Sequence, residues 1–171
     1  MELLGKPLRE GHGNRQTAKI TSMSEAGTWE VFAVRYAHHE RMAKENFLGG
    51  DIHDGPMPMD YFVWALRQGD RVIAIDTGFD EAMAKKRGRQ FLHSPVEGLK
   101  QIGIDAGAVK DVIISHMHYD HSGNHGLFPN AQFHLQDREM QFVSGRYMTH
   151  AVMRLPFDVE DVVAKIGRAH V

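Results

Sequence analysis

The feature that most constrains this chain of 171 residues is one histidine-rich stretch, Ser115-His116-Met117-His118-Tyr119-Asp120-His121-Ser122-Gly123-Asn124. It directly follows the apolar run Val112-Ile113-Ile114, which is typical of a short buried strand. If the backbone stays extended past the end of this strand, the side-chain period of two puts His116 and His118 on one face. Two imidazoles at this spacing can share one metal ion, so we expect a metal site at the end of the strand.

Two further polar groups complete the predicted site. Asp120 and His121 follow in a turn that ends at Gly123, where they are free to point at a second ion beside the first. Three imidazoles and a carboxylate suit zinc, or a similar divalent metal such as iron, manganese or cobalt. Chance clustering is the alternative, because the chain has 12 histidines, but four specified positions so close together rarely match by chance.

Composition limits the ligands and the partners that the chain could have. The sequence has no cysteine, which excludes disulfides and thiolate ligands and leaves His, Asp and Glu to hold a metal. A net charge of -2 gives no basic field for nucleic acid or for a membrane surface. No apolar segment has the length of a signal peptide core or of a membrane span, so we expect a soluble, cytoplasmic protein of one domain.

The pattern His-x-His-x-Asp-His at the end of a hydrophobic strand resembles the signature of the metallo-β-lactamase superfamily. The whole stretch from Ser115 to Asn124 is particularly similar to the N-acyl-homoserine lactonase branch of that superfamily. Two upstream stretches agree with this branch, Asp76-Thr77-Gly78 and Gly49-Gly50-Asp51-Ile52-His53-Asp54-Gly55-Pro56-Met57-Pro58-Met59-Asp60-Tyr61. The likeness runs from about Val31 to about Val163 and covers only the front half of such an enzyme.

The resemblance implies an α/β (α+β) fold that forms the amino-terminal half of a metallo-β-lactamase-type αββα sandwich. It also implies two divalent metal ions, with zinc the expected metal. His116 and His118 would hold the first ion, while Asp120 and His121 would hold the second. Asp120 would in addition be catalytic, because it would help to orient the attacking hydroxide.

Asp76 has two alternative roles at the end of its strand. The resemblance implies that its carboxylate buttresses the loops of the metal site from outside the ligand set. The simpler alternative is that Asp76 only begins a turn with Thr77 and Gly78.

The activity implied by the resemblance is opening of the lactone ring of N-acyl-homoserine lactones, which is quorum quenching. A metal-bound hydroxide would attack the carbonyl of this small-molecule substrate, since bound metals lower the pKa of water. Another lactone, a thioester or a β-lactam would meet the same chemistry and is the alternative within enzymes. A non-catalytic metal-binding fragment is the alternative outside them, because half a sandwich leaves one sheet face open to water or to a second copy in a homodimer.

Composition and the extent of the resemblance together divide the chain into three parts. Residues 1–26 are polar, without helical or strand period, and are predicted to be a flexible leader, with a translated upstream segment as the alternative. Residues 27–165 are predicted to form a partial metallo-β-lactamase-like domain. Residues 166–171 match the translation of a common sequencing adapter and are predicted to be a non-native tail, so the chain is expected to be truncated.

Hydrophobic periodicity and turn residues predict the remaining elements. A β-branched and aromatic run predicts a first strand from Thr28 to Tyr36, and two apolar runs around Gly69-Asp70 predict a hairpin of residues 61–66 and 71–75. A helix is expected over residues 81–88, with its basic run, 85–87, as a solvated face. Further elements are expected as a helix from N-cap Ser94 to Gly103, a strand at 131–135, a helix at 137–143 with Asp137 as N-cap, and weak helical character at 147–155.

The other histidines are assigned structural roles. His38 and His39 are interpreted as solvated loop residues after the first strand, because adjacent residues on a strand point to opposite faces and cannot readily share an ion. His134 is interpreted as a strand histidine whose hydrogen bonds are satisfied, and His125 as helical surface. Two downstream histidines, His150 and His170, do not have the spacing of the family's distal ligands.

The long connection at residues 41–58 is the remaining segment with possible access to the site, since long ordered loops are often lids or binding loops. His53 and Asp54 are its polar candidates, but the His-x-His-x-Asp-His run already supplies the near-side ligands. Met57, Met59 and Phe62 could line a substrate pocket, although core packing is the simpler role. No residue is assigned to substrate binding.

Overall fold

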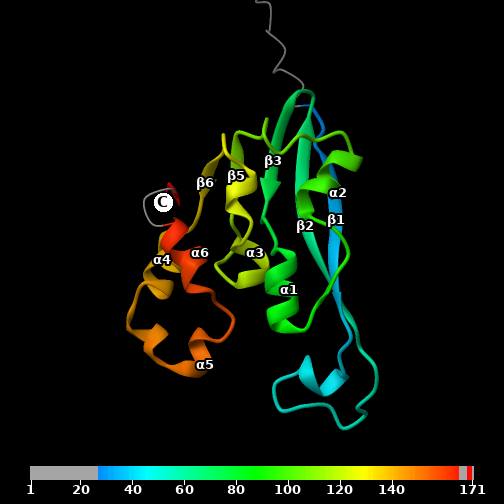
Figure 1. The fold of residues 1–171 in the computed structure, drawn as a ribbon, viewed down its shortest axis with the longest axis vertical. Helices are drawn as coiled ribbons and strands as arrows, with labels where there is room; N and C mark the ends of the chain where they lie inside the picture. Colours follow the sequence, from blue (N-terminus) through cyan, green and yellow to red (C-terminus); the bar gives the residue numbers. More distant parts are fainter. Residues whose placement is uncertain (1–26, 166–168, 171) are drawn as a thin grey trace, which may run out of the picture.

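The structure is a computed structural model that describes residues 27–165 and 169–170 (Figure 1). The predicted leader, residues 1–26, lies outside the described residues, as do positions 166–168 and 171 of the predicted tail. The described residues form one seven-stranded sheet in the order β4-β1-β2-β3-β5-β6-β7. Its strands are β1 (Glu30–His39), β2 (Met59–Gln68), β3 (Arg71–Ile75), β4 (Gln90–Phe91), β5 (Asp111–Ile113), β6 (Gln132–His134) and β7 (Ala169–His170).

The sheet has an antiparallel part and a parallel part. β4, β1, β2 and β3 pair antiparallel, and β3, β5, β6 and β7 pair parallel. The predicted hairpin is confirmed: β2 and β3 are joined at Gly69, whose positive φ of 57° suits a tight turn. The predicted end of the first strand at Tyr36 is wrong, because β2 pairs with β1 as far as His39, while β4 adds pairing at Ala37 and His38 on the other side.

Short helices connect and cover the strands. They are α1 (Glu81–Arg87), α2 (Pro95–Gln101), α3 (Tyr119–Ser122), α4 (Asp137–Val143), α5 (Ala151–Arg154) and α6 (Val159–Lys165), with 3-10 turns η1 (Ala43–Glu45), η2 (His125–Leu127) and η3 (Arg146–Thr149). No helix within residues 27–165 and 169–170 has the length and hydrophobicity to cross a membrane.

Most of the helices predicted from the sequence are present, but one predicted N-cap residue is wrong. At α2 the backbone N–H of Ser94 donates to Glu97 Oε2 at 3.2 Å, as expected for a capping box. The N-cap of α4 is Gln136, and Asp137 is instead the first helical residue, where its negative charge still favours the helix N-terminus. α6 was not predicted from the sequence, although Val162 on it is buried in the core.

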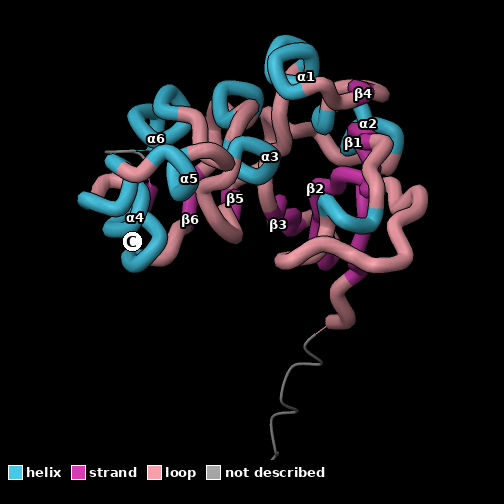
Figure 2. Tube along the Cα trace, turned by 90° about the horizontal axis from the view of Figure 1, so that it is seen from below, coloured by secondary structure: helices cyan, strands magenta, loops and turns pink. Residues whose placement is uncertain are grey.

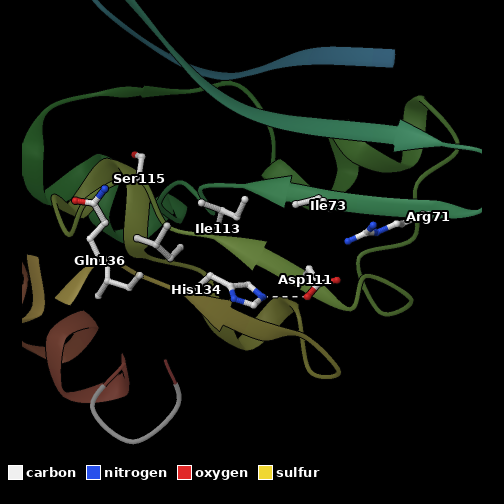
Figure 3. Close-up of a pocket in the computed structure, with 9 residues that line it drawn as sticks. Arg71, Ile73, Asp111, Ile113, Ser115, His134 and Gln136 are labelled. Carbon is white, nitrogen blue, oxygen red and sulfur yellow. Dashed lines mark hydrogen bonds and ion pairs between the residues drawn. The ribbon is translucent and has the colours of Figure 1, made fainter. Parts of the chain in front are cut away.

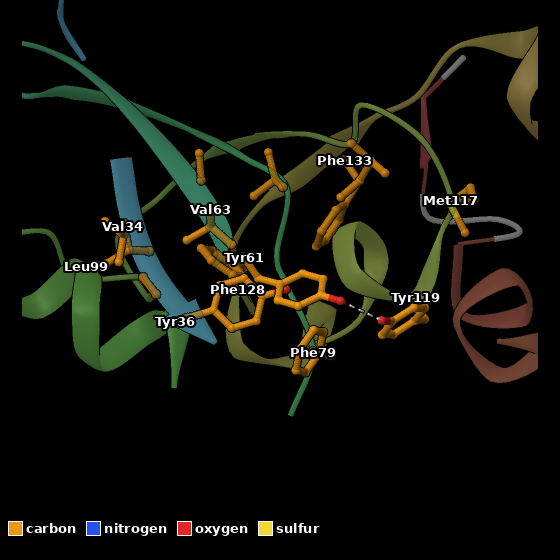
Figure 4. Close-up of a cluster of buried hydrophobic side chains, with 14 of the residues drawn as sticks. Val34, Tyr36, Tyr61, Val63, Phe79, Leu99, Met117, Tyr119, Phe128 and Phe133 are labelled. Atoms are coloured by element: carbon orange, nitrogen blue, oxygen red, sulfur yellow. Dashed lines mark hydrogen bonds between the residues drawn. The ribbon is translucent and has the colours of Figure 1, made fainter. Parts of the chain in front are cut away.

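The helices lie mainly on one side of the sheet, as Figure 2 shows. Alternate strand residues point into the core between the two layers, where Tyr36, Tyr61 and Phe79 form a cluster of edge-packed rings (Figure 4). Residues of the opposite strand parity stay open to solvent, among them Trp64 and Ile113 with exposed fractions of 42% and 38%. The predicted α/β class is therefore confirmed as a single sheet with helices on one face.

The open face holds a pocket of about 530 Å³ (Figure 3). Its lining combines the apolar Ile73 and Ile113 with the pair of His134 and Asp111, whose Nε2 and Oδ1 atoms are 2.9 Å apart. The prediction that His134 is a satisfied strand histidine is thus confirmed.

Candidate metal centre

The parallel pairing of β3 with β5 places the carboxyl ends of both strands side by side. The backbone N–H of Asp76, just after β3, donates to Ile113 O of β5 at 2.8 Å. Asp76 has a positive φ of 63°, a conformation that Asp tolerates better than most residues. This turn directs the carboxylate of Asp76 toward the histidine-rich stretch that follows β5.

The Asp76 carboxylate contacts two residues of the histidine-rich stretch, Ser115 and His121. It accepts from the backbone N–H and the hydroxyl of Ser115 at 2.7 and 2.8 Å, and it lies 2.7 Å from Nδ1 of His121. Only 4% of Asp76 is exposed. A buried carboxylate needs such partners, and these contacts are the ones that a buttressing role requires.

The histidine rings lie together at the end of β5. The ring centroid of His116 is 4.4 Å from that of His118 and 3.9 Å from that of His121. Between the first two, Met117 is fully buried and its backbone N–H donates to Glu139 Oε1 at 2.8 Å. His118 has extended dihedrals, φ -61° and ψ 149°. The out-in-out alternation of residues 116–118 is thus the extended arrangement expected from the sequence.

Hydrogen bonding at Nδ1 orients two of these rings. Because the Ser115 hydroxyl donates to Asp76, its oxygen is free to accept from Nδ1 of His116, 3.0 Å away. Nδ1 of His121 likewise donates to Asp76. In both rings the Nδ1 atom is engaged, and Nε2 is the nitrogen left to bind a metal, as is usual for histidine ligands.

Asp120 and His121 lie on the single turn of helix α3, which replaces the irregular turn expected from the sequence. Oδ2 of Asp120 is 3.4 Å from Nε2 of His121. The other side of α3 is held by Tyr36, whose fully buried hydroxyl donates to the backbone oxygen of Asp120 at 2.8 Å.

The charge states of the site follow from burial and from these pairs. Burial lowers the pKa of His121, but hydrogen bonds to Asp120 and Asp76 outweigh it and raise the pKa to about 9. Burial, and then the charge of neighbouring imidazoles, hold the pKa values of His116 and His118 below the ordinary value. Burial acts to raise the pKa of Asp120, but the bond to His121 outweighs it and leaves that pKa lowered. Asp120 is therefore an ionised acceptor at neutral pH.

The stretch Asp76-Thr77-Gly78 is hydrogen-bonded to the histidine-rich stretch and packs closely against it. The backbone N–H of Thr77 donates to His121 O at 2.8 Å, and the Thr77 hydroxyl donates to Gly123 O. A Cβ atom added at Gly123 would lie 2.5 Å from the backbone oxygen of Gly78. Glycine is required at this crossing because the two backbones pack directly against each other.

Sequence reasoning missed two arginines beside the centre. Arg89 Nε donates to the hydroxyl of Tyr119 at 3.1 Å, and the guanidinium carbon of Arg87 lies 4.0 Å from the Tyr119 ring centroid. The basic run 85–87 was expected to be a solvated face, but Lys86 pairs with Asp158 at 2.9 Å and Arg87 packs inward. The contacts join segments 30 or more residues apart in the sequence, so the charge run alone could not reveal them.

The histidines outside the motif have partners of their own. His38 and His39 are strand residues, so their prediction as solvated loop residues is wrong. His38 lies 2.6 Å from Asp60, and His39 lies 3.1 Å from Arg89.

The connection at residues 41–58 and the downstream histidines add no contact to the centre that the structure shows. The carboxylate of Asp54 pairs with Lys44 at 2.9 Å. His150 is exposed at the start of α5, and the side chain of His170 lies outside the described part of the chain.

The donor chemistry of His116, His118, Asp120 and His121 fits a divalent metal, since all four are partly exposed and none is a thiolate. Among the described residues, however, no group of three or more His, Asp or Glu side chains is arranged so that it could hold an ion without further adjustment. The structure thus brings together the predicted ligands, while their role as ligands stays a prediction.

Comparison with known proteins finds sequence similarity over part of the chain. Residues 57–139 match the family model described as the metallo-β-lactamase superfamily. The chain is 47% identical over 47 residues to the N-acyl homoserine lactonase AttM of Azorhizobium caulinodans, and 43% identical over 47 residues to AttM of Agrobacterium fabrum. Each match covers 28% of this chain and 18% of the lactonase.

Solved structures show the same fold over a longer stretch. A quorum-quenching N-acyl homoserine lactone lactonase has a TM-score of 0.57 at 18% identity, covering 80% of this chain and 53% of that chain. AidC, a dizinc quorum-quenching lactonase in complex with its product, has a TM-score of 0.58 at 16% identity, covering 84% of this chain and 58% of that chain. The chain therefore spans little more than half the length of these two lactonases. Residues 57–139 thus resemble the metallo-β-lactamase superfamily, and the chain is similar to N-acyl-homoserine lactonases in its fold and its signature stretch.

Proposed function

We propose that this chain carries the near-side metal centre of a metal-dependent hydrolase that opens the ring of N-acyl-homoserine lactones. The observation that carries the proposal is the contact of three histidine rings at the end of β5, two of them oriented through Nδ1 by Asp76 and Ser115. The similarity to AttM lactonases supports the substrate class. A cytoplasmic location and a homodimer stay predictions.

His116 and His118 would hold one divalent ion, and Asp120 and His121 a second. When bound, such ions supply Lewis acidity and lower the pKa of water to near neutrality. Asp120 would help to orient the attacking hydroxide, since its lowered pKa keeps the carboxylate ionised and able to accept a hydrogen bond.

His121 differs from the other predicted ligands in its charge. With a pKa of about 9, it is protonated on both nitrogens at neutral pH when no metal is bound. It must release the proton from Nε2 before it can act as a ligand. Asp76 would keep the Nδ1 proton in place throughout, which holds the ring in one orientation.

The test is metal uptake followed by a lactone assay. Purified chain is dialysed against zinc, manganese or cobalt and its metal content is measured by elemental analysis. We expect stoichiometric uptake, and we expect that replacing both His116 and His118 by Ala abolishes it. Retention of the metal by the double variant would contradict the assignment.

Ring opening of N-hexanoyl-homoserine lactone is then followed by pH-stat on each metal-loaded sample. Acid release that depends on metal and on His116 and His118 would support the hydrolase. We expect little or no acid release from this chain by itself, so the same assay is run on a full-length relative. Metal uptake without acid release from this lactone, a thioester or a β-lactam by either protein would favour the alternative, a non-catalytic metal-binding polypeptide.

A further inference from the structure

The segment between α5 and α6 crosses directly over one of the predicted ligands. Phe157 forms an isolated antiparallel bridge with His118, and its ring packs edge-on against the imidazole, with centroids 4.8 Å apart and planes at 83°. Next to this bridge, the backbone N–H of Tyr119 donates to Pro156 O at 2.8 Å. The position of the His118 ring therefore depends on where residues 155–157 lie.

Arg87, the last residue of α1, connects this segment to the site. Its two terminal nitrogens donate to Leu155 O at 2.8 Å and to Phe157 O at 3.3 Å. The same guanidinium lies over the Tyr119 ring, 4.0 Å from its centroid. One planar cation thus joins α1, the crossing segment and the residue between His118 and Asp120.

We propose that Arg87 is a positioning residue, which fixes residues 155–157 over His118 and thereby orients that imidazole for metal binding. The inference rests on the proposed function, because it assigns a purpose to the orientation of His118. Only arginine offers two parallel donors and a flat face for an aromatic ring; lysine offers a single point charge. The ion pair of Lys86 with Asp158 acts on the same segment, but Lys86 is largely exposed and such a pair is weak.

The first measurement needs no metal. Hydrogen exchange at the Tyr119 amide reports whether Pro156 still accepts its bond, and the NMR shifts of the His118 ring protons report the edge contact with Phe157. In Arg87→Met we expect exchange at Tyr119 to be about tenfold faster or more, because two charge-assisted hydrogen bonds are lost. We also expect the His118 shifts to move toward those of an unstacked imidazole. Arg87→Lys should be intermediate.

The second measurement is zinc affinity by competition with a chelator. Loss of an outer partner of a metal ligand typically costs 10–100-fold in affinity, so we expect at least about tenfold weaker binding in Arg87→Met and a smaller loss in Arg87→Lys. Lys85→Met is the matched control, since Lys85 is an exposed cation on the same helix. It should match the unmodified chain in all three readouts.

Each outcome decides between the proposals. Unchanged Tyr119 exchange and unchanged His118 shifts in both Arg87 variants would overturn the inference. These two readings need no zinc, so they remain decisive if the unmodified chain binds none. Failure of the unmodified chain to bind zinc would refute the proposed function instead. Faster exchange with full zinc affinity would also overturn it, because Arg87 would then only stabilise the segment. If Arg87→Met does not fold, the same readings on Arg87→Lys decide.

Discussion

His121 lies between two carboxylates, with Nδ1 2.7 Å from Asp76 Oδ2 and Nε2 3.4 Å from Asp120 Oδ2. The two acids are not equivalent. Asp76 is buried and is bound by Ser115 as well, whereas Asp120 is partly exposed on α3. Asp76 can therefore orient the ring permanently, while the contact of Nε2 with Asp120 can be exchanged for a metal.

Replacing Asp76 by Asn should weaken metal binding while preserving the turn. Asn tolerates the left-handed backbone of position 76 and its amide oxygen can still accept from Ser115, but the fixed negative charge beside His121 is lost. We expect zinc affinity to fall by about 10- to 100-fold, measured by chelator competition. Asp76→Ala should in addition lower the stability of the metal-free chain by about 1–3 kcal/mol, because it leaves buried donors unpaired.

The control for this pair is Asp70→Asn, which removes an exposed carboxylate from the β2–β3 turn. It should leave zinc affinity and stability unchanged. An Asp76→Asn variant that bound zinc as tightly as the unmodified chain would show that Asp76 only shapes the turn, the alternative that the sequence left open.

Local sequence signals predicted much of the fold because they act through nearest neighbours. The β2–β3 hairpin, the capping box of α2 and the strand before His116 all rest on residues within a few positions of one another. The extended path through His116 and His118 follows from the strand period in the same way.

Long-range pairing explains what the sequence did not reveal. β1 continues to His39 because β2 pairs with it as far as Met59, and β4, about 50 residues later, pairs with Ala37 and His38. Arg87 and Arg89 reach Tyr119 only through the folded chain, and the partners of Asp76 lie 39 and 45 residues away. The family resemblance indicated a supporting role for Asp76, but no local pattern could have indicated one for the arginines.

The backbone at Gly123 packs directly against the backbone at Gly78, so a side chain at position 123 should lower the stability of the chain. In Gly123→Ala the new Cβ would meet Gly78 O at 2.5 Å and Phe79 Cα at 3.3 Å, and backbone atoms cannot turn aside as side chains can. We expect a loss of about 1–3 kcal/mol in the free energy of urea unfolding. Gly126→Ala is the control, since a Cβ at Gly126 meets nothing within 4 Å. Equal stability of the two variants would contradict the close packing of the loops.

Tyr36 supports the centre from the core side. Burial raises the pKa of Tyr36, so the hydroxyl stays protonated and donates to Asp120 O at any ordinary pH. Tyr36→Phe keeps the packing of the ring and removes only that hydrogen bond. We expect a loss of about 0.5–1.5 kcal/mol in the free energy of unfolding, from the usual net worth of one bond. Unfolding in urea measures it, and a variant as stable as the unmodified chain would mean that water replaces the hydroxyl.

The last prediction concerns Asp161 on α6 and gives a pH dependence that is independent of metal. Burial raises the pKa of Asp161 to about 6; Lys165 opposes the shift, and Asp158 and Asp80 add to it. The folded chain therefore binds the Asp161 proton more tightly than the unfolded chain, whose ordinary value is 3.8. It follows that stability is lost as the pH rises from about 4 through about 6, and that the cost is full above that range.

Asp161→Asn removes the charge at nearly constant size, so it should be more stable than the unmodified chain at pH 8, by roughly 1–2 kcal/mol after allowance for partial solvent screening. The advantage should shrink as the pH falls through this range, and it should vanish only below about pH 3, where Asp161 is protonated in both states. Urea unfolding at pH 4, 6 and 8 in the presence of a chelator measures both chains. Glu160→Gln removes an exposed charge from the same helix and should change stability little at any of these values. A gain for Asp161→Asn that stayed constant with pH would show that the substitution acts through packing, since only the titration of a buried carboxyl makes the difference grow as the pH rises.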